Sequence, residues 1–106
     1  MTPTGQISPA FAAFFAEAPQ HAQAWMEMVK GMAATSALDP KTQAIAYISV
    51  LAALRMESGI PFHVAHAKQL GVTREEIISA ILLGLPAAGH AVTQVLPKAL
   101  EVFDRT

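Results

Sequence analysis

The amino-acid sequence predicts an all-α protein, with residues 1–106 in a single domain. At two places a capping side chain is followed directly by proline, in Ser8-Pro9 and Asp39-Pro40, and this pair is typical of a helix start. Apolar residues recur at spacings of three and four, which is the period of a helix. No segment has the convincing alternation of apolar and polar residues that predicts a strand.

Three helices are expected in the first half of the chain. The first covers Ala10–Glu17. The second runs from about Pro19 to Ala33, because proline suits a first turn but not a helix interior. Its apolar residues share one face: Trp25, Met28, Val29 and Met32. The third, from Pro40 to about Arg55, is apolar nearly all round, which is typical of a central helix buried on most sides.

A fourth helix is expected to begin near Ser58, whose hydroxyl can cap it. Pro61 then falls inside the first turn, where proline is tolerated. The helix is expected to end at Gly71, because glycine is the residue that most often follows a helix in the left-handed conformation.

Two more helices complete a prediction of about six. Thr73 and Glu76 have the spacing of a capping box, which opens a helix over Arg74–Leu85. The last helix is expected over about Ala87–Phe103, with a kink at Pro97 because proline removes a helical hydrogen bond.

The composition indicates an oligomer and excludes several other classes of protein. Charged residues make up 14% of the chain, against about 25% in a typical domain. Residues of the apolar set make up 53%. A monomer of this size would expose much of that apolar surface, so we expect subunits to bury it against each other. A net charge of −1 without a basic cluster argues against nucleic acid as a partner.

Localisation and redox chemistry are also restricted by the sequence. The longest apolar runs, Ala44–Leu54 and Ile77–Leu85, are shorter than the roughly 20 residues of a membrane span. The first residues lack the basic start and apolar centre of a signal peptide, so a cytoplasmic protein is expected. The chain has no cysteine, which excludes disulfides and thiol nucleophiles.

Three short motifs together resemble the carboxymuconolactone decarboxylase / alkylhydroperoxidase D-like superfamily. They are Pro40-Lys41-Thr42, His63 eight residues before Gly71, and the motif Gly-x-Thr-x-Glu-Glu-Ile over residues 71–77. The resemblance covers about residues 38–80. It implies a helical bundle of the alkylhydroperoxidase D-like fold that assembles as a trimer or hexamer.

The resemblance also shows where this chain departs from the redox members of the superfamily. Those members carry Cys-x-x-Cys-x-x-x-His, and the two cysteine positions are Met56 and Gly59 here. The position of the glutamate that assists the thiols is Ala44. A thiol peroxidase needs a thiolate and a resolving thiol, and this chain has neither. The site therefore resembles the decarboxylase branch, which keeps the histidine without the cysteine pair.

Five residues around the start of the fourth helix are candidates for chemistry. His63 lies near the helix N-terminus, whose partial positive charge should lower the pKa of the imidazole and leave a neutral base. Glu57 is a candidate acid or a group that orients His63, and Arg55 suits a two-point contact with a substrate carboxylate. The N–H groups of Gly59 and Ile60 at the helix start would suit an anion.

The remaining histidines are weaker candidates. His66 shares part of a helical face with His63 and is a candidate substrate contact. Two histidines at this spacing, with His90 or Glu57, would also suit a metal, but solvated or interface histidines are the simpler interpretation. No metal or other cofactor is therefore expected.

The sequence leaves three functions open. The first is a histidine-dependent lyase or isomerase acting on a small carboxylate or lactone. The second is a catalytically silent helical oligomer with a binding or scaffolding role. The third is a peroxidase, which the superfamily label suggests and the missing thiols oppose.

Overall fold

The computed structural model describes residues 7–106, which fold into α-helices and short 3-10 turns with no strand. The elements are α1 (Pro9–Glu17), α2 (Pro19–Thr35), α3 (Pro40–Ala53), η2 (Glu57–Gly59), α4 (Ile60–Gln69), α5 (Arg74–Leu82), α6 (Leu85–Ala88), η3 (Gly89–Val95) and α7 (Leu96–Arg105). The all-α prediction is confirmed. The six expected helices become seven because the last one is divided.

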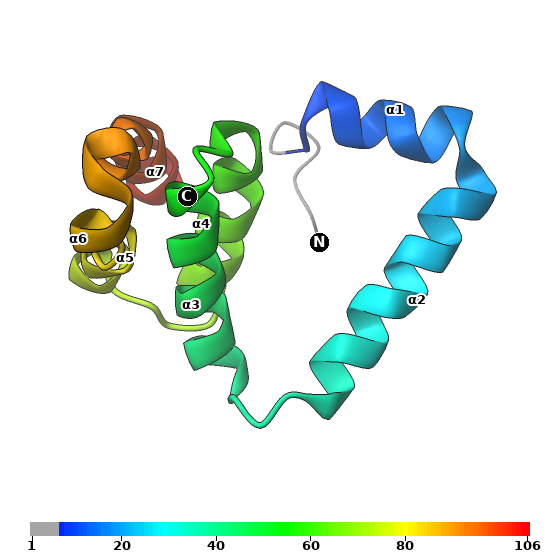
Figure 1. The fold of residues 1–106 in the computed structure, drawn as a ribbon, viewed down its shortest axis with the longest axis horizontal. Coiled ribbons are helices and arrows are strands. Elements are labelled where there is room, and N and C mark those ends of the chain that lie inside the picture. Colours follow the sequence, from blue (N-terminus) through cyan, green and yellow to red (C-terminus); the bar gives the residue numbers. More distant parts are fainter. Residues whose placement is uncertain (1–6) are drawn as a thin grey trace.

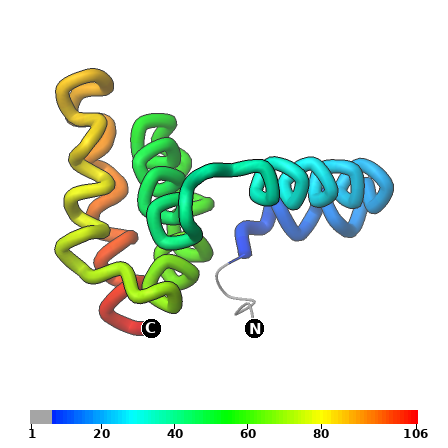
Figure 2. Tube along the Cα trace, turned by 90° about the horizontal axis from the view of Figure 1, so that it is seen from below, coloured from blue at the N-terminus to red at the C-terminus, as the bar shows by residue number. Residues whose placement is uncertain are grey.

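The described chain has two parts, a helical bundle from α3 to α7 and an arm of α1 and α2 that projects from it (Figure 1). The view in Figure 2 shows the same separation from below, with one short connecting segment between α2 and α3. Helices α1 and α2 pack mainly on each other, whereas the elements of the bundle pack among themselves. The arm therefore presents most of α2 to solvent.

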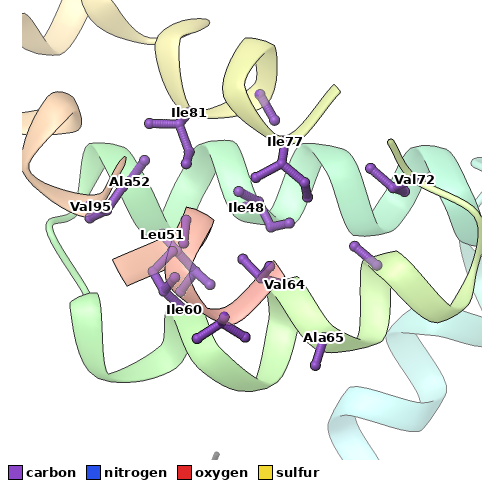
Figure 3. Packing of buried hydrophobic residues seen from close by; sticks show 14 of the residues in the cluster. Ile48, Leu51, Ala52, Ile60, Val64, Ala65, Val72, Ile77, Ile81 and Val95 are labelled. Atoms are coloured by element: carbon purple, nitrogen blue, oxygen red, sulfur yellow. The ribbon is translucent and has the colours of Figure 1, made fainter. Parts of the chain in front are cut away.

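The core of the bundle lies between α3, α4, α5, η3 and α7. Figure 3 shows its centre, where Ile48 of α3 meets Val64 of α4 and Ile77 of α5. These three side chains are fully buried. Helices α3 and α5 are also joined by the Ser49 hydroxyl, which donates a hydrogen bond of 2.7 Å to the carbonyl of Ala80. Burial of branched apolar side chains at the α3 surface is therefore what assembles the bundle.

The expectation that the third helix is buried on most sides is wrong for the single chain. Its buried residues are Ile48, Leu51 and Ala52, which face α4, α5 and η3. On the other side, Tyr47 and Val50 keep about half of their surface exposed, at 45% and 51%. The other elements of the bundle cover one side of α3, so its second apolar side has no cover within residues 7–106.

Several predicted helix ends are confirmed by hydrogen bonds. The Ser8 hydroxyl accepts from the N–H of Phe11, and the Asp39 carboxylate accepts from the N–H of Thr42. Thr73 and Glu76 form both hydrogen bonds of the expected capping box.

Ser58 does not cap α4, which corrects the prediction at this helix. Ser58 lies inside the 3-10 turn η2, and the residue before the helix is Gly59, which has no capping side chain. Proline at the first turn of α4 is tolerated as expected.

The predicted kinked helix over residues 87–103 is also wrong. Pro97 stands in the first turn of a new helix, α7, rather than inside a continuing one. The preceding seven residues form the 3-10 segment η3, which starts at Gly89 with a φ of 75°. Because such a φ is left-handed, α6 ends there and α7 starts afresh.

By length and hydropathy the segment Arg74–Arg105 passes as a membrane-spanning helix. In the structure this segment is divided into α5, α6, η3 and α7, and α5 packs against α7. Its apolar residues Ile77, Ile81 and Val95 lie in the bundle core. Packing within the bundle thus accounts for part of its hydropathy.

The turn after α4 supports a direct test of backbone strain. Gly71 has a φ of 89°, and no atom lies within 4 Å of where a Cβ would stand. Gly71→Ala should therefore lower the free energy of unfolding by about 1–2 kcal/mol through the left-handed backbone alone. Gly71→Asn should lose less, since asparagine tolerates this conformation better. Urea melts of both variants at one protein concentration measure the difference, and equal stability of Gly71→Ala and wild type would contradict it.

Candidate functional site

The candidate residues lie where α3 turns into α4. Helix α3 ends with the N–H of Arg55 bonded to the carbonyl of Ala52 and the N–H of Met56 bonded to that of Leu51. This pattern closes a helix when the residue after its cap is left-handed, and Arg55 has a φ of 57°. Glycine usually occupies this position, as Gly71 does after α4. An arginine held there is strained, and such strain is common near functional sites.

The ring of His63 is half-buried on α4, in contact with two other aromatic rings. Its centroid lies 4.5 Å from that of Tyr47 on α3 and 5.1 Å from that of Phe62. Burial, together with a smaller effect of the nearby charge of His66, lowers the pKa of His63 to about 4. The expected neutral imidazole is therefore present at pH 7. Desolvation, rather than the helix N-terminus, is the main cause.

Tyr47 is the residue that the sequence interpretation missed. It is the only tyrosine of the chain and, with Ser49, one of two hydroxyl-bearing residues in the run from Ala44 to Leu54. Because a tyrosine hydroxyl near apolar surface normally requires a partner, this placement was the available signal. Among residues 7–106, neither the Tyr47 hydroxyl nor the His63 ring forms a side-chain hydrogen bond, so both polar groups remain available to a ligand.

Arg55 and Glu57 are near His63 in sequence but make no contact with its ring that the structure records. Arg55 donates a hydrogen bond of 2.8 Å to the side-chain oxygen of Gln94 on η3. Glu57 lies exposed in η2. Arg55 therefore faces η3 in this structure, and a carboxylate would have to displace Gln94 to bind it.

The N–H groups of Gly59 and Ile60 are not free for an anion, contrary to the sequence interpretation. The N–H of Gly59 donates to the carbonyl of Met56 at 3.1 Å, and the N–H of Ile60 donates to that of Glu57. Ile60 is also fully buried in the core. The turn η2 satisfies the donors that a simple helix start would have left open.

The other histidines lie apart from any group able to complete a metal site. The exposed His66 stacks on Phe62 at 6.3 Å, so the Phe62 ring stands beside both His63 and His66. His90 is exposed in η3. Within residues 7–106 no three histidine, aspartate or glutamate side chains gather closely enough to hold a metal ion.

The structure is thus an all-α bundle in a chain without cysteine, and His63 lies one turn into α4, after the left-handed Arg55. The profile of the carboxymuconolactone decarboxylase family matches residues 19–102, most of the chain. The chain therefore belongs to the carboxymuconolactone decarboxylase family. No curated protein and no solved structure matches it significantly.

The lowered pKa of His63 predicts a pH dependence of stability. In the unfolded chain a histidine titrates near 6.5, and in the folded protein His63 titrates near 4. Between these values the unfolded state binds more protons, so stability should fall as the pH falls through this window, by about 2–3 kcal/mol. Denaturant melts at pH 7, 6, 5 and 4.5 measure this loss.

The control for this measurement is His63→Gln, which removes the titrating ring. The carboxylates with lowered pKa are Asp39, Glu76 and Asp104, and their stabilisation is lost mainly below about pH 4.5. The 4.5–6.5 window therefore separates His63 from them. An unchanged pH slope in His63→Gln would show that His63 does not titrate as the structure requires.

Proposed function

We propose that the chain is a histidine-dependent lyase or isomerase that acts on a small carboxylate or lactone, without thiol peroxidase chemistry. The observation that carries this proposal is the contact between the His63 and Tyr47 rings. These rings place a neutral base and a phenolic ring side by side. That combination suits removal of a proton from a carbon next to a carbonyl group.

His63 would accept the proton, and the Tyr47 hydroxyl would donate a hydrogen bond to the oxygen where negative charge develops. Tyr47 thus takes the role that the sequence assigned to the N–H groups of Gly59 and Ile60. A pKa near 4 makes His63 a weak base in the free protein. A bound carboxylate would raise that pKa toward neutrality, because an opposite charge favours the imidazolium.

Arg55 and Glu57 are the other two charged groups in the proposed site. The guanidinium of Arg55 would bind the substrate carboxylate after leaving Gln94. Glu57, exposed in the same turn, would return a proton or orient the substrate. His66 would contact substrate from the far side of the Phe62 ring.

The alternative is a catalytically silent helical oligomer with a binding or scaffolding role. One observation favours it: an open depression on the bundle, lined by Ala65, Lys68, Gln69 and Thr106, would bind a ligand without involving His63. In either case we propose a cytoplasmic protein that forms a homo-oligomer, a trimer or hexamer by resemblance to the superfamily. Self-association is supported by the exposed apolar side chains on one side of α2 and of α3.

Substitutions at His63 and Tyr47 distinguish the two functions. The probe is carboxymuconolactone, the compound named by the family, with loss of substrate followed by proton NMR. For the enzyme, Tyr47→Phe should lower the rate by about 10²-fold or more, since it removes only the hydroxyl. Its effect on stability should stay within about 0.5 kcal/mol, as for other exposed positions.

His63→Ala should abolish turnover while lowering stability by about 1 kcal/mol, because the ring is half-buried and without side-chain hydrogen bonds. A matched variant, His90→Ala, should leave turnover unchanged. If neither His63→Ala nor Tyr47→Phe alters turnover or binding of the lactone, the silent-oligomer function is favoured.

Peroxidase activity gives a further prediction. The chain has no thiol to attack a peroxide or to resolve a sulfenic acid. Metal-free protein should therefore reduce an organic hydroperoxide with a dithiol reductant no faster than buffer. Saturable turnover above the buffer rate would refute this prediction and favour a peroxidase.

A further inference from the structure

Most of one apolar stripe on the arm has no cover within the described chain. It consists of Trp25, Met28, Val29 and Met32, which recur at three- and four-residue spacings along α2. Helix α1 covers the start of α2 through Phe11, whose ring lies 5.2 Å from that of Trp25, and Ala22 is buried there. Beyond this contact Met28 is 51% exposed and Met32 is 66% exposed. We call these four residues the α2 stripe.

A second stripe of the same length lies on the open side of α3. It consists of Tyr47, Val50 and Leu54, and each of the three is about half exposed or more. Both stripes extend over eight positions, from Trp25 to Met32 and from Tyr47 to Leu54, or about 10 Å of helix between the first and last residue. No charged residue occurs between Thr42 and Leu54. Absence of charge from an exposed helix face is typical of the centre of a protein interface.

We infer that the α2 stripe of one copy packs on the α3 stripe of a second copy, and that the two copies exchange arms in this way. Reciprocal exchange places the seven side chains of each copy in one interface. At roughly 100 Å² apiece, they would bury an area within the range of about 1,200–2,000 Å² that stable interfaces require. The two contacts are identical by symmetry, so each pair of copies covers both stripes. Of the two assemblies proposed above, the hexamer accommodates this exchange, as three such pairs.

The connection between the arm and the bundle holds α2 away from its own α3. The Thr35 hydroxyl bonds back to the carbonyl of Met32 at 3.0 Å, and the N–H of Leu38 bonds to the Ser36 hydroxyl at 3.1 Å. Asp39 then caps α3. These local bonds lie at the two ends of the short connection, and Figures 1 and 2 show α2 splayed away from α3. A second copy is therefore the occupant that the α3 stripe fits.

The exchange would complete the site around His63. Tyr47 belongs to the α3 stripe, and its ring contacts the ring of His63. The arm of the second copy would cover this pair with Met28 and Met32, whose flexible side chains adapt to irregular surfaces. The inference rests on the proposed self-association but not on the proposed chemistry, since it requires only that the two stripes meet.

The test uses the absence of cysteine, because each introduced thiol is then unique. Val29→Cys and Val50→Cys are prepared as two separate proteins, one with a mass tag, and mixed under conditions that let subunits exchange. A short bismaleimide is then added. The expected product is a covalent dimer of one tagged and one untagged chain. The control pair is Val29→Cys with Ser79→Cys, an exposed position on α5 outside both stripes, and it should give no such dimer.

Sedimentation of wild type and of Met32→Glu distinguishes failure of the inference from failure of self-association. Met32→Glu should shift the assembly toward smaller species, whereas Ser79→Glu should leave its mass unchanged. A wild-type protein of monomer mass would overturn both self-association and arm exchange. An oligomer without the Val29–Val50 cross-link would overturn arm exchange alone. The same holds if a chain carrying both Val29→Cys and Val50→Cys cross-links only within itself.

Discussion

The packing of α3 is the constraint on which the rest of this structure depends. Its buried side, built on Ile48 and Leu51, gathers α4, α5 and η3 into one bundle. Its open side carries Tyr47 and Val50. A helix that is apolar on both sides cannot be satisfied by one chain of this size, because the bundle has too few elements to surround it. The fold, the site beside His63 and the proposed assembly therefore all originate from the same helix.

Local signals in the sequence were sufficient for most helix ends. Capping by Asp39 and Thr73, and the stop at Gly71, depend on neighbours within a few residues, so they could be predicted without tertiary contacts. The end of the chain was harder, because Pro97 is compatible with a kink and with a new first turn. Packing of η3 against α3 decides between them, and such packing is invisible to spacing rules.

The site shows a similar division between local and tertiary information. The direction of the pKa shift of His63 was predictable from the sequence. Its main cause is burial, and the ring is buried against Tyr47 of α3 and Phe62 of α4. The donors of Gly59 and Ile60 were expected to be free because the extra turn η2 was not foreseen. The chain belongs to the carboxymuconolactone decarboxylase family and has no cysteine, so the chemistry proposed for it depends on groups other than thiols.

Arg55 gives the turn before α4 two competing requirements. Its left-handed backbone would be relaxed by glycine, whereas only a long side chain reaches Gln94 on η3. Selection for heat resistance alone would favour glycine at this position, and selection for a cationic group beside the turn would favour arginine. Laboratory evolution toward thermostability should thus replace Arg55 early. The resulting bundle would be more stable but would lack the cationic group at this turn.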